Sequence, residues 1–377
     1  MITSESTCRR KHMPILEKIV ISDFRNIQLQ ELEFSPNVNC ISGNNGEGKT
    51  NLLDAIYYMS MTKSAFASSD RFNFRHGTDE FSISGMYRME NGTRSRFALK
   101  MSAKGDKKMR RDDKPYGRVS EHVGMLPVVM VSPADISMVS ESGEERRRFA
   151  NAVLSQMDRE YMSALQQYNR LLLQRNRMLT EMEPDISLLE VVDMRMSALA
   201  EPVYQARKRF VADLNPVVSE YYKAVSGGSE NVCIEYASEL DKAPLEHLLK
   251  ASAEKDRIMK HTTSGIHRDD FIFTMNGHPI RRYGSQGQQK SFLVSLKFAQ
   301  YDIMKRNYGF APILLLDDVF DKLDMGRISN LLQMVTGSDF GQIFITDSNK
   351  VRMAGIVDAL TSDRAYFETV KGTFSRI

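Results

Sequence analysis

The sequence predicts an α/β fold made of two separate stretches of the chain, with a mainly helical segment inserted between them. An apolar run, VNCIS (38–42), leads into a glycine-rich turn and a helical pattern, the strand–loop–helix order of parallel α/β sheets. A second apolar run, ILLLDDVF (313–320), contains a pair of acids. Between the two runs, residues 144–225 carry Leu and Met at helical spacing. These three observations define the predicted fold class.

Local patterns predict the individual elements in order. Strands are expected where apolar residues alternate or run continuously between turn residues such as Asn91-Gly92. They cover 15–24, 38–42, 81–88, 95–102, 126–132, 231–237, 270–275, 313–320 and 342–346. Helices are expected after Gly48, over 144–182 and 186–225, and after the polar stretch YGSQGQQKS (283–291). Pro184 should break the helical segment, Pro202 is a candidate kink, and Gly227-Gly228 should end it.

Composition allows a sizeable core but leaves the ligands open. Of 377 residues, 42% are hydrophobic and 26% charged, which is typical of a soluble globular protein long enough for two domains. The net charge of +3 is too small to indicate a nucleic-acid partner by itself. The scattered cysteines (Cys8, Cys40 and Cys233) fit neither a disulfide framework nor a zinc site. With no signal-peptide or membrane-spanning pattern, we expect a reducing, cytoplasmic location.

A phosphate-binding loop is predicted at GNNGEGKT (43–50), which matches G-x-x-x-x-G-K-[ST] between a strand and a helix. Glycines let backbone N–H groups curl around phosphate oxygens, and the helix N-terminus favours the anion. Lys49 would meet the β- and γ-phosphates of a nucleotide, and Thr50 would ligate Mg²⁺. The alternative is a glycine-rich strand–helix turn without a ligand. The predicted cofactor-binding residues are Gly43, Asn44, Asn45, Gly46, Glu47, Gly48, Lys49 and Thr50.

The acids after the ILLL strand are candidates for the metal and for catalysis. Ligands bind beyond the carboxyl ends of parallel strands. Asp317 would hold Mg²⁺ through its water shell, and Asp318 would polarise the attacking water. The alternative is a strand that ends in a solvated acidic turn.

The stretch SQGQQ (285–289) contains S-x-G-Q, the core of the signature of ATP-binding-cassette ATPases. In that superfamily the signature of one subunit caps the γ-phosphate held by another, so Ser285, Gly287 and Gln288 would contact a partner's nucleotide. The alternative is a turn and helix cap. FDKLD (320–324) fits the D-loop position that follows, or equally an acidic helix start with Asp324 as N-cap.

Together these motifs resemble the RecF family, bacterial recombination mediators related to the chromosome-maintenance (SMC) ATPases. The matching segments are DFRNI (23–27), GNNGEGKTNLLDAIYYMS (43–60), SPADISMVSESGEERRRFAN (132–151), GIHRDDFIF (265–273), YGSQGQQKS (283–291), LLLDDVFDKLD (314–324) and QIFITD (342–347). The resemblance covers about residues 13 to 370. It implies an ABC-type, SMC-like ATPase head with a helical second lobe, and ATP-dependent dimerisation on DNA at gaps or junctions. It also implies cooperation with RecO and RecR in loading RecA, in replication, recombinational repair and the SOS response.

Changes in the sequence pattern set the expected domain limits, and the resemblance implies one more nucleotide contact. We expect the ATPase domain at 13–143 and 259–377 and the helical lobe at 144–258, after an extension (1–12) that is disordered or precedes the true start at Met13. Arg25 falls where family members contact nucleotide, although a solvent-facing strand-end arginine is the alternative. No chemical role follows from the residues for His267, Arg268 and Asp269, and a satisfied structural histidine fits equally well.

Departures from the wider superfamily point to slow turnover. The second acid is Asp318 instead of the usual Glu, Thr346-Asp347 stands where a switch histidine is usual, and residues 131–135 offer only Asp135 in place of a metal-sensing glutamine. We therefore expect a weak, DNA-stimulated ATPase in which ATP clamps a dimer and hydrolysis times its release, while whether the chain is an enzyme at all stays open.

A basic segment is the candidate DNA contact. Residues 94–118 hold ten Lys or Arg against three Asp, a local excess of seven in a chain of net charge +3, which suits phosphate contacts without sequence reading. The alternative is a solvated hairpin loop. The absence of interleaved aromatics favours duplex backbone over single strands, and Arg146–Arg148 are either a second contact or a salt-bridged helix start. The predicted contacts are Lys104, Lys107, Lys108, Arg110, Arg111 and Lys114.

Two other functions are compatible with the nucleotide motifs. The chain could be the ATPase subunit of an ABC-type transporter, although the signature lies more than 200 residues beyond the phosphate-binding loop. It could also be a structural DNA binder that does not hydrolyse ATP.

Overall fold

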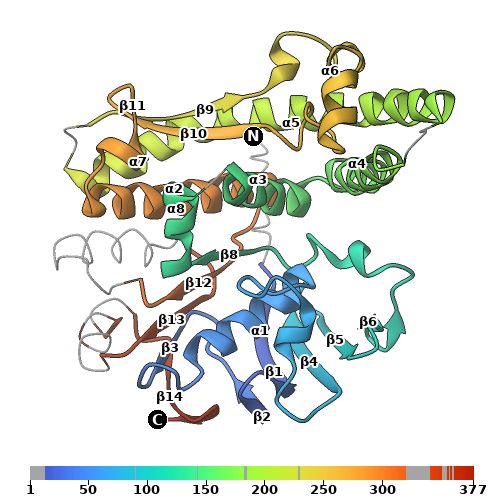
Figure 1. Cartoon of the computed structure of the whole chain (residues 1–377). Helices are drawn as coiled ribbons and strands as arrows, with labels where there is room; N and C mark the ends of the chain where they lie inside the picture. The colour runs from blue at the N-terminus through green and yellow to red at the C-terminus, as the bar shows by residue number, and fades with distance from the viewer. Residues whose placement is uncertain are drawn as a thin grey trace, which may run out of the picture. The chain divides into compact units, whose positions relative to one another are not determined.

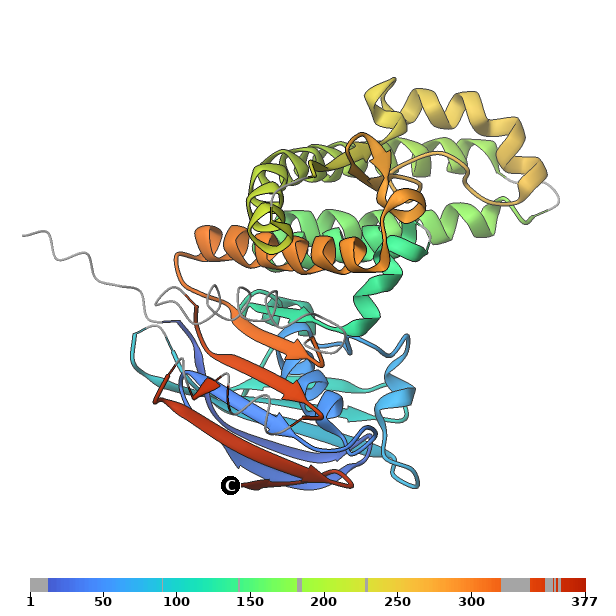
Figure 2. The same ribbon diagram turned by 90° about the vertical axis from the view of Figure 1, so that its left-hand side faces the viewer.

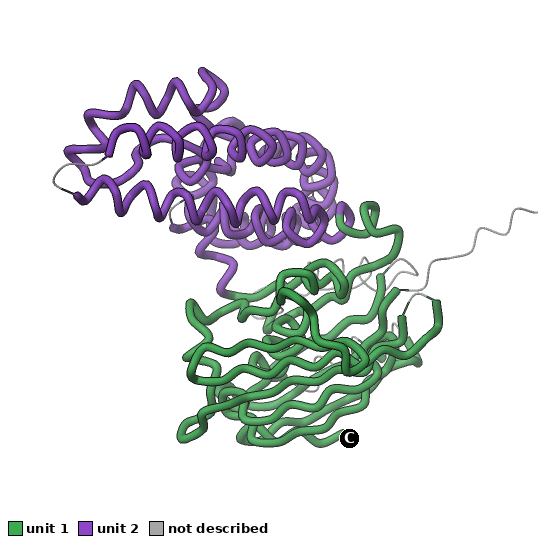
Figure 3. The backbone as a smooth tube through the Cα atoms, turned by 90° about the vertical axis from the view of Figure 1, so that its right-hand side faces the viewer, with its two compact units in different colours: residues 1–133, 304–377 green, residues 134–303 purple. Residues whose placement is uncertain are grey.

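The computed structural model describes residues 13–89, 91–141, 143–181, 185–227, 230–319, 340–349, 355, 357–358 and 361–377 (Figure 1). The expected N-terminal extension, the break at Pro184 and the FDKLD segment lie outside the described residues. The chain forms two compact units (Figure 3): unit 1 is residues 1–133 with 304–377, and unit 2 is residues 134–303. Within the described ranges, no helix is long and apolar enough to cross a bilayer.

Unit 1 contains a six-stranded, mainly parallel sheet in the order β15-β14-β3-β13-β12-β8. Only β14 and β15 pair antiparallel. Every residue of β3, β8, β12 and β13 is buried, which explains why these strands are continuous apolar runs. The predicted α/β class is confirmed. The strands are β3 (Val38–Ser42), β8 (Val128–Val131), β12 (Ile313–Asp317), β13 (Ile343–Asp347), β14 (Arg364–Val370) and β15 (Thr373–Arg376).

The second sheet of unit 1 is antiparallel, in the order β2-β1-β4-β5-β6-β7. Helix α1 (Lys49–Met61) packs against strands of both sheets (Figure 2), and its Tyr58 ring meets Phe24 and Phe81 edge-on. The strands are β1 (Ile15–Phe24), β2 (Ile27–Glu33), β4 (Glu80–Arg88), β5 (Arg94–Ser102), β6 (Lys107–Arg111) and β7 (Lys114–Pro115), with 3₁₀ turns at Asp70–Asn73 and Val119–His122.

Unit 2 is mainly helical and holds a small sheet in the order β11-β10-β9. The predicted helix over 144–182 is wrong in one respect: it is two helices, because the Asp158 carboxylate accepts the N–H groups of Glu160 and Tyr161 and caps a new helix start. Helix α5 runs through Pro202 and ends at Gly227, whose φ of 83° forms a left-handed cap. The elements are α2 (Ser137–Ser140), α3 (Gly143–Met157), α4 (Arg159–Met178), α5 (Ile186–Ser226), α6 (Leu245–Met259), α7 (Ile280–Tyr283), α8 (Gln286–Tyr308), β9 (Val232–Ala237), β10 (Asp270–Met275) and β11 (His278–Pro279), with 3₁₀ turns at Pro133–Ile136 and Glu239–Asp241. Pro133 and the end of α8 from Met304 onward are assigned to unit 1.

The compact units do not coincide with the expected domains. Residues 134–143 and 259–303, expected in the ATPase domain, group with the helices in unit 2. The reason is a hairpin-like pairing: β10 pairs with β9 over six residues, from Asp270↔Ala237 to Met275↔Val232, and also packs on α3. Strand pairing between segments far apart in sequence is invisible to local patterns.

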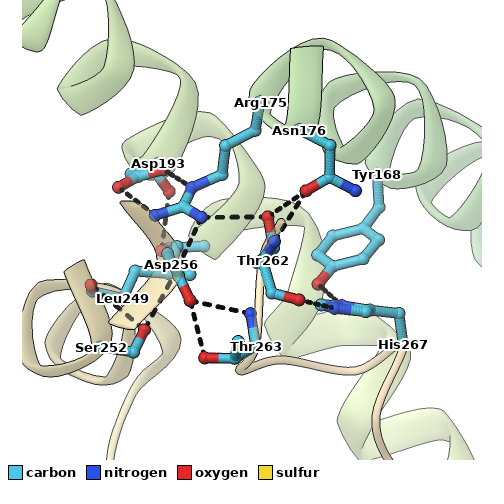
Figure 4. A network of polar contacts seen from close by, with 11 residues as sticks. Tyr168, Arg175, Asn176, Asp193, Leu249, Ser252, Asp256, Thr262, Thr263 and His267 are labelled. Atoms are coloured by element: carbon cyan, nitrogen blue, oxygen red, sulfur yellow. Dashed lines mark hydrogen bonds and ion pairs between the residues drawn. The ribbon is translucent and has the colours of Figure 1, made fainter. Parts of the chain in front are cut away.

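Buried ion pairs hold the helices of unit 2 together (Figure 4). The Arg175 guanidinium on α4 donates to Asp193 on α5 and to Asp256 near the end of α6, both at 2.6 Å. Arg175 and Asp256 are 1% and 0% exposed, so their charges must be compensated within the protein. Thr262 accepts from Arg175 at 3.0 Å and brings the following segment into the same network.

The HRDD element (267–270) continues this network. Asp269 pairs with Arg207 of α5 at 2.8 Å, with both side chains 1% exposed, and Asp270 pairs with Arg146 of α3 at 2.8 Å. The Nε2 of His267 lies 3.1 Å from the Thr262 carbonyl, which can only accept, so Nε2 carries the proton and Nδ1 accepts from the Tyr168 hydroxyl at 2.9 Å. The element therefore has a structural role inside unit 2.

We predict that His267 makes unit 2 sensitive to acid. Burial lowers the pKa of His267 to about 4, against about 6.5 in the unfolded chain. Between these values the unfolded chain binds the proton and the folded chain does not, so stability falls as pH drops from 6.5 to 4, by about 3 kcal/mol in all. His267→Gln, whose amide can replace both hydrogen bonds, should flatten denaturant-unfolding stability over this range. His247→Gln, at an exposed position of α6, should change nothing, and equal slopes for His267→Gln and wild type would contradict the assignment.

Candidate nucleotide site

The phosphate-binding loop connects β3 to α1 in a conformation that requires glycine. Gly48 has φ 113° directly before the helix, a region that side-chain-bearing residues rarely adopt. A Cβ on Gly43 would lie 2.7 Å from the Thr369 carbonyl oxygen on β14. The Glu47 carbonyl accepts from Gly372 N–H at 2.8 Å and from the Thr369 hydroxyl at 3.1 Å, so the β14–β15 hairpin holds the loop in place.

Lys49 lies inside the loop. Its Nζ donates to the carbonyls of Gly43 at 2.8 Å and Asn44 at 3.2 Å, and the residue is 4% exposed. An ammonium group held by carbonyls at the N-terminus of α1 places positive charge where the loop's backbone N–H groups also gather. The arrangement can bind a phosphate.

Thr50 and Asp317 come together from segments 267 residues apart. The Thr50 hydroxyl lies 3.0 Å and 2.9 Å from the two carboxylate oxygens of Asp317. Asp317 is 3% exposed, and burial raises its pKa, against hydrogen bonds from Thr346 and Thr50. A hydroxyl and a carboxylate are hard oxygen donors of the kind Mg²⁺ takes, with water and phosphate oxygens completing its octahedron. The residues present thus fit the predicted metal.

Asp318 follows β12 with φ 44°, and its N–H donates to the Thr346 hydroxyl at 3.0 Å. Asp135, the expected stand-in for a metal-sensing glutamine, pairs with Lys297 at 2.8 Å inside unit 2. Asp347 accepts the N–H of Asn349 at 2.7 Å. Asp318 is therefore next to Asp317 in the chain. Asp135 is paired with a lysine of unit 2 instead.

Arg25 occupies an internal network next to α1. Its guanidinium pairs with Asp54 at 2.6 Å and donates to Asn51 at 3.0 Å, and to Ser64 and Asn73. The side chain is 17% exposed, so the alternative of a solvent-facing arginine is wrong. Asn51 is the residue after Thr50, and it also donates to Asn26 at 2.7 Å. Asn26 lies beside Gly48. It belongs to the DFRNI segment, for which only Arg25 was predicted to contact the nucleotide.

The signature stretch forms a reciprocal helix cap within unit 2. The Ser285 hydroxyl accepts the N–H of Gln288 at 3.2 Å, and the Gln288 side-chain carbonyl accepts the N–H of Ser285 at 2.7 Å. This is a capping box at the start of α8, so the cap alternative is realised. The Gln288 amide also donates to Glu230 at 2.7 Å, a partner that sequence reasoning missed. The Ser285 hydroxyl keeps its own proton and can still donate to an anion.

The basic segment presents its residues on two opposite faces. Lys107 pairs with Asp70 at 2.7 Å and lies over the Tyr58 ring, and Arg111 lies over Phe97; both point to the packed face of the sheet. Lys108 and Arg110 alternate with them along β6 and are exposed. The segment therefore does not form one surface, and the side chains of Lys107 and Arg111 are 21% and 39% exposed. A DNA contact of these residues stays a prediction. Lys104 lies in the β5–β6 turn and Lys114 in β7, both exposed.

Arg146–Arg148 form a salt-bridged helix start. Arg146 is held by Asp270 and by the Met138 carbonyl, Arg147 donates to the Asp269 carbonyl, and Arg148 pairs with Glu144 and Glu145. Of the two alternatives for these residues, a second DNA contact or a salt-bridged helix start, the structure shows the helix start.

The family model and the curated relatives that match this chain all point to one family. Residues 15–363 match the family described as the RecF/RecN/SMC N terminal domain. The chain is 42% identical over 358 residues to the DNA replication and repair protein RecF of Parabacteroides distasonis, covering 95% of this chain and 98% of the relative. It is 41% identical over 364 residues to the RecF protein of Bacteroides fragilis, covering 96% and 98%.

Solved structures give the same picture. The recombination mediator protein RecF in its complexes with ATPrS and ATP, from the RecFOR pathway, superposes with a TM-score of 0.87 at 27% and 28% identity, covering 98% and 97% of this chain and 100% and 98% of those chains. An Smc head domain from Pyrococcus furiosus has a TM-score of 0.57 at 16% identity, covering 97% of this chain and 96% of its own. That likeness concerns the fold alone, which is the ABC-type ATPase fold of SMC-like heads.

Proposed function

The chain belongs to the RecF family, and from this premise we propose that it is an ATP- and DNA-binding protein of DNA replication and repair. The observation that carries the proposal is the contact of Thr50 with Asp317 at 2.9 Å, because it joins the phosphate-binding loop to the acid of the ILLL strand. These are the two parts that a nucleotide with its metal requires. The relatives named above include RecF proteins solved with ATP and an ATP analogue.

In this proposal each side chain of the loop has one task. The backbone of residues 43–48 and the N-terminus of α1 hold the phosphates, and Lys49 leaves its carbonyl partners for the β- and γ-phosphates. Thr50 and Asp317 would hold Mg²⁺, which supplies charge neutralisation at the phosphates. Arg25 acts indirectly. It binds Asp54 and Asn51 and thereby fixes the first turn of α1. A direct contact of Arg25 with the nucleotide would require it to release one of these two partners.

Hydrolysis, in this proposal, is slow. Asp318 is the acid that orients the attacking water, and its carboxylate is one methylene shorter than the usual glutamate. A longer reach to the water lowers the efficiency of general-base catalysis. ATP then serves mainly to hold a state of the protein, and hydrolysis ends that state.

The held state is a dimer in which α8 of one chain meets the ATP of the other. Ser285 can donate its hydroxyl proton while its lone pair caps the helix, and Gly287 leaves backbone access at the positive end of α8. Gln288 stays oriented through Glu230. The capping box supports this proposal, since it positions donors at the helix start without consuming the proton of Ser285.

We predict that charge at Ser285 blocks dimerisation but not ATP binding. Ser285→Arg obstructs the phosphate position, and Ser285→Asp keeps a good helix cap while it repels the phosphate. Both variants should bind ATP as monomers and remain monomeric with ATP and Mg²⁺ in analytical ultracentrifugation. Leu173→Arg, at a 71% exposed position of α4, should dimerise like wild type. ATP-dependent dimers of Ser285→Asp at wild-type strength would refute the role of the signature.

DNA is proposed to lie along the outer face of β5 and β6. On this face Lys100 stands directly opposite Lys108 in the strand register. The Glu80 carboxylate already pairs with Lys100 at 2.6 Å, so Lys108 is the member of this like-charge pair that favours a further anion. Arg110 and Arg96 extend the face. Lys104 and Lys114 flank it, whereas Lys107 and Arg111 lie on the other face of β6, over the Tyr58 and Phe97 rings. Duplex phosphates are suitable anions, since the face has no stacking aromatic among these side chains.

We predict that this face contributes about two phosphate contacts from β6 alone. Lys108→Gln with Arg110→Gln should weaken duplex binding and reduce the slope of log affinity against log salt by about two. The matched control is Lys250→Gln with Lys255→Gln, which removes the same charge from α6. Fluorescence anisotropy over 50–200 mM salt measures both. A control that loses as much slope, or an unchanged β6 variant, would contradict the assignment.

The partners follow from the family. We propose that the protein acts in the cytoplasm with RecO and RecR at gaps or single-strand/double-strand junctions and helps to load RecA, in recombinational repair and the SOS response. Membership of the RecF family argues against the transporter alternative. A non-hydrolysing DNA binder differs from the proposal only in lacking the slow ATPase step.

A further inference from the structure

Thr346 lies on β13 beside the end of β12, where Asp317 and Asp318 follow one another. It is completely buried, near the end of β13, and is paired in parallel register with Asp317 of β12. The strands β12 and β13 lie side by side (Figure 1). The Thr346 hydroxyl donates to Asp317 Oδ1 at 2.8 Å. The Thr346 hydroxyl oxygen also accepts the N–H of Asp318, at 3.0 Å. One hydroxyl group thus contacts both acids, the first through its carboxylate and the second through its backbone.

The contact with Asp318 stabilises an unfavourable backbone. Asp318 has φ 44°, in the left-handed region where a non-glycine residue persists only when neighbouring contacts hold it. Its N–H donates to the Thr346 hydroxyl on the neighbouring strand at 3.0 Å. The hydrogen bond therefore fixes the peptide between Asp317 and Asp318, and with it the direction in which the Asp318 side chain leaves the strand.

The contact with Asp317 orients a carboxylate. Thr346 and Thr50 approach Asp317 from different elements, β13 and α1. Oδ1 accepts from both hydroxyls, and Oδ2 also accepts from Thr50, at 2.9 Å. If a bound ligand weakens the hydrogen bond from Thr50 to Asp317, the hydrogen bond from Thr346 still keeps the carboxylate in its rotamer. Outer contacts of this kind tune metal affinity by about 10–100-fold.

We propose that Thr346 is a positioning residue that presets Asp317 for Mg²⁺ and Asp318 for the attacking water. The inference rests on the proposed ATP site and adds a residue to which no role was assigned. Thr346 stands where a histidine-bearing switch is usual in related ATPases, and the neighbouring Asp347 is engaged with Asn349 in a local turn. Thr346, near the end of β13, therefore orients both Asp317 and Asp318 by hydrogen bonds.

The test compares hydroxyl removal with hydroxyl retention. Thr346→Val keeps the shape and loses the hydroxyl, Thr346→Ser keeps the hydroxyl, and Thr346→Ala serves as a second hydroxyl-free variant if the valine chain fails to fold. A fluorescent ATP analogue is titrated onto the full chain with EDTA and then at rising Mg²⁺, and the thermal midpoint of each variant is recorded alongside.

The hydroxyl-free variants should bind the metal-free nucleotide like wild type but need at least about 10-fold more Mg²⁺ for half of the Mg²⁺ effect, whereas Thr346→Ser should stay within about twofold. An unchanged Mg²⁺ requirement in Thr346→Val or Thr346→Ala would overturn the inference, and so would a loss of metal-free binding of the same size, which indicates a merely structural role. If wild type binds the analogue without any response to Mg²⁺, the proposed ATP site itself is wrong.

Discussion

The hydrogen bonds between Thr50 and Asp317 define the architecture of unit 1, because each of their requirements constrains a different part of the chain. Thr50 must start a helix directly after β3, which requires a loop with left-handed glycine at position 48. Asp317 must end a neighbouring buried strand, which requires β3, β13 and β12 to run parallel and in register. Parallel pairing brings the carboxyl ends of the strands to one edge. The charged groups that collect there are tolerated because they compensate one another.

The signature region shows how one group can satisfy two demands. A helix start leaves N–H donors without partners, and the capping box formed by Ser285 and Gln288 satisfies part of them within the chain. A hydroxyl has one proton and two lone pairs, so capping uses the lone pair and leaves the proton for an anion. The polar stretch at the start of α8 is thus stable in a single chain, and the proposed dimer needs no rearrangement of the cap.

The sequence was most informative where burial is complete and the interaction is local. Continuous apolar runs predicted β3, β8, β12 and β13, and the glycine spacing predicted the loop. Non-local contacts were out of reach: Thr346 and Glu230 have ordinary sequence surroundings, and only strand register and folding bring them to Asp317 and Gln288. The basic segment was recognised by charge, but its division into two faces needs the period of β6, which places Lys107 and Arg111 on the same face as the buried Met109. The role of HRDD depended likewise on helix residues 62 and 99 positions away in the chain, Arg207 and Tyr168.

The central claim is that a complete ATP site is shared between two chains, and mixing two defective chains tests it most directly. Lys49→Ala removes the phosphate contact of the loop, and Ser285→Asp removes the signature, so neither variant alone should dimerise with ATP. A mixed pair contains one intact loop facing one intact signature. Sedimentation of the equimolar mixture with ATP and Mg²⁺ should therefore reveal heterodimers that neither variant forms alone. A mixture that stays monomeric, while wild type dimerises under the same conditions, would contradict a shared site.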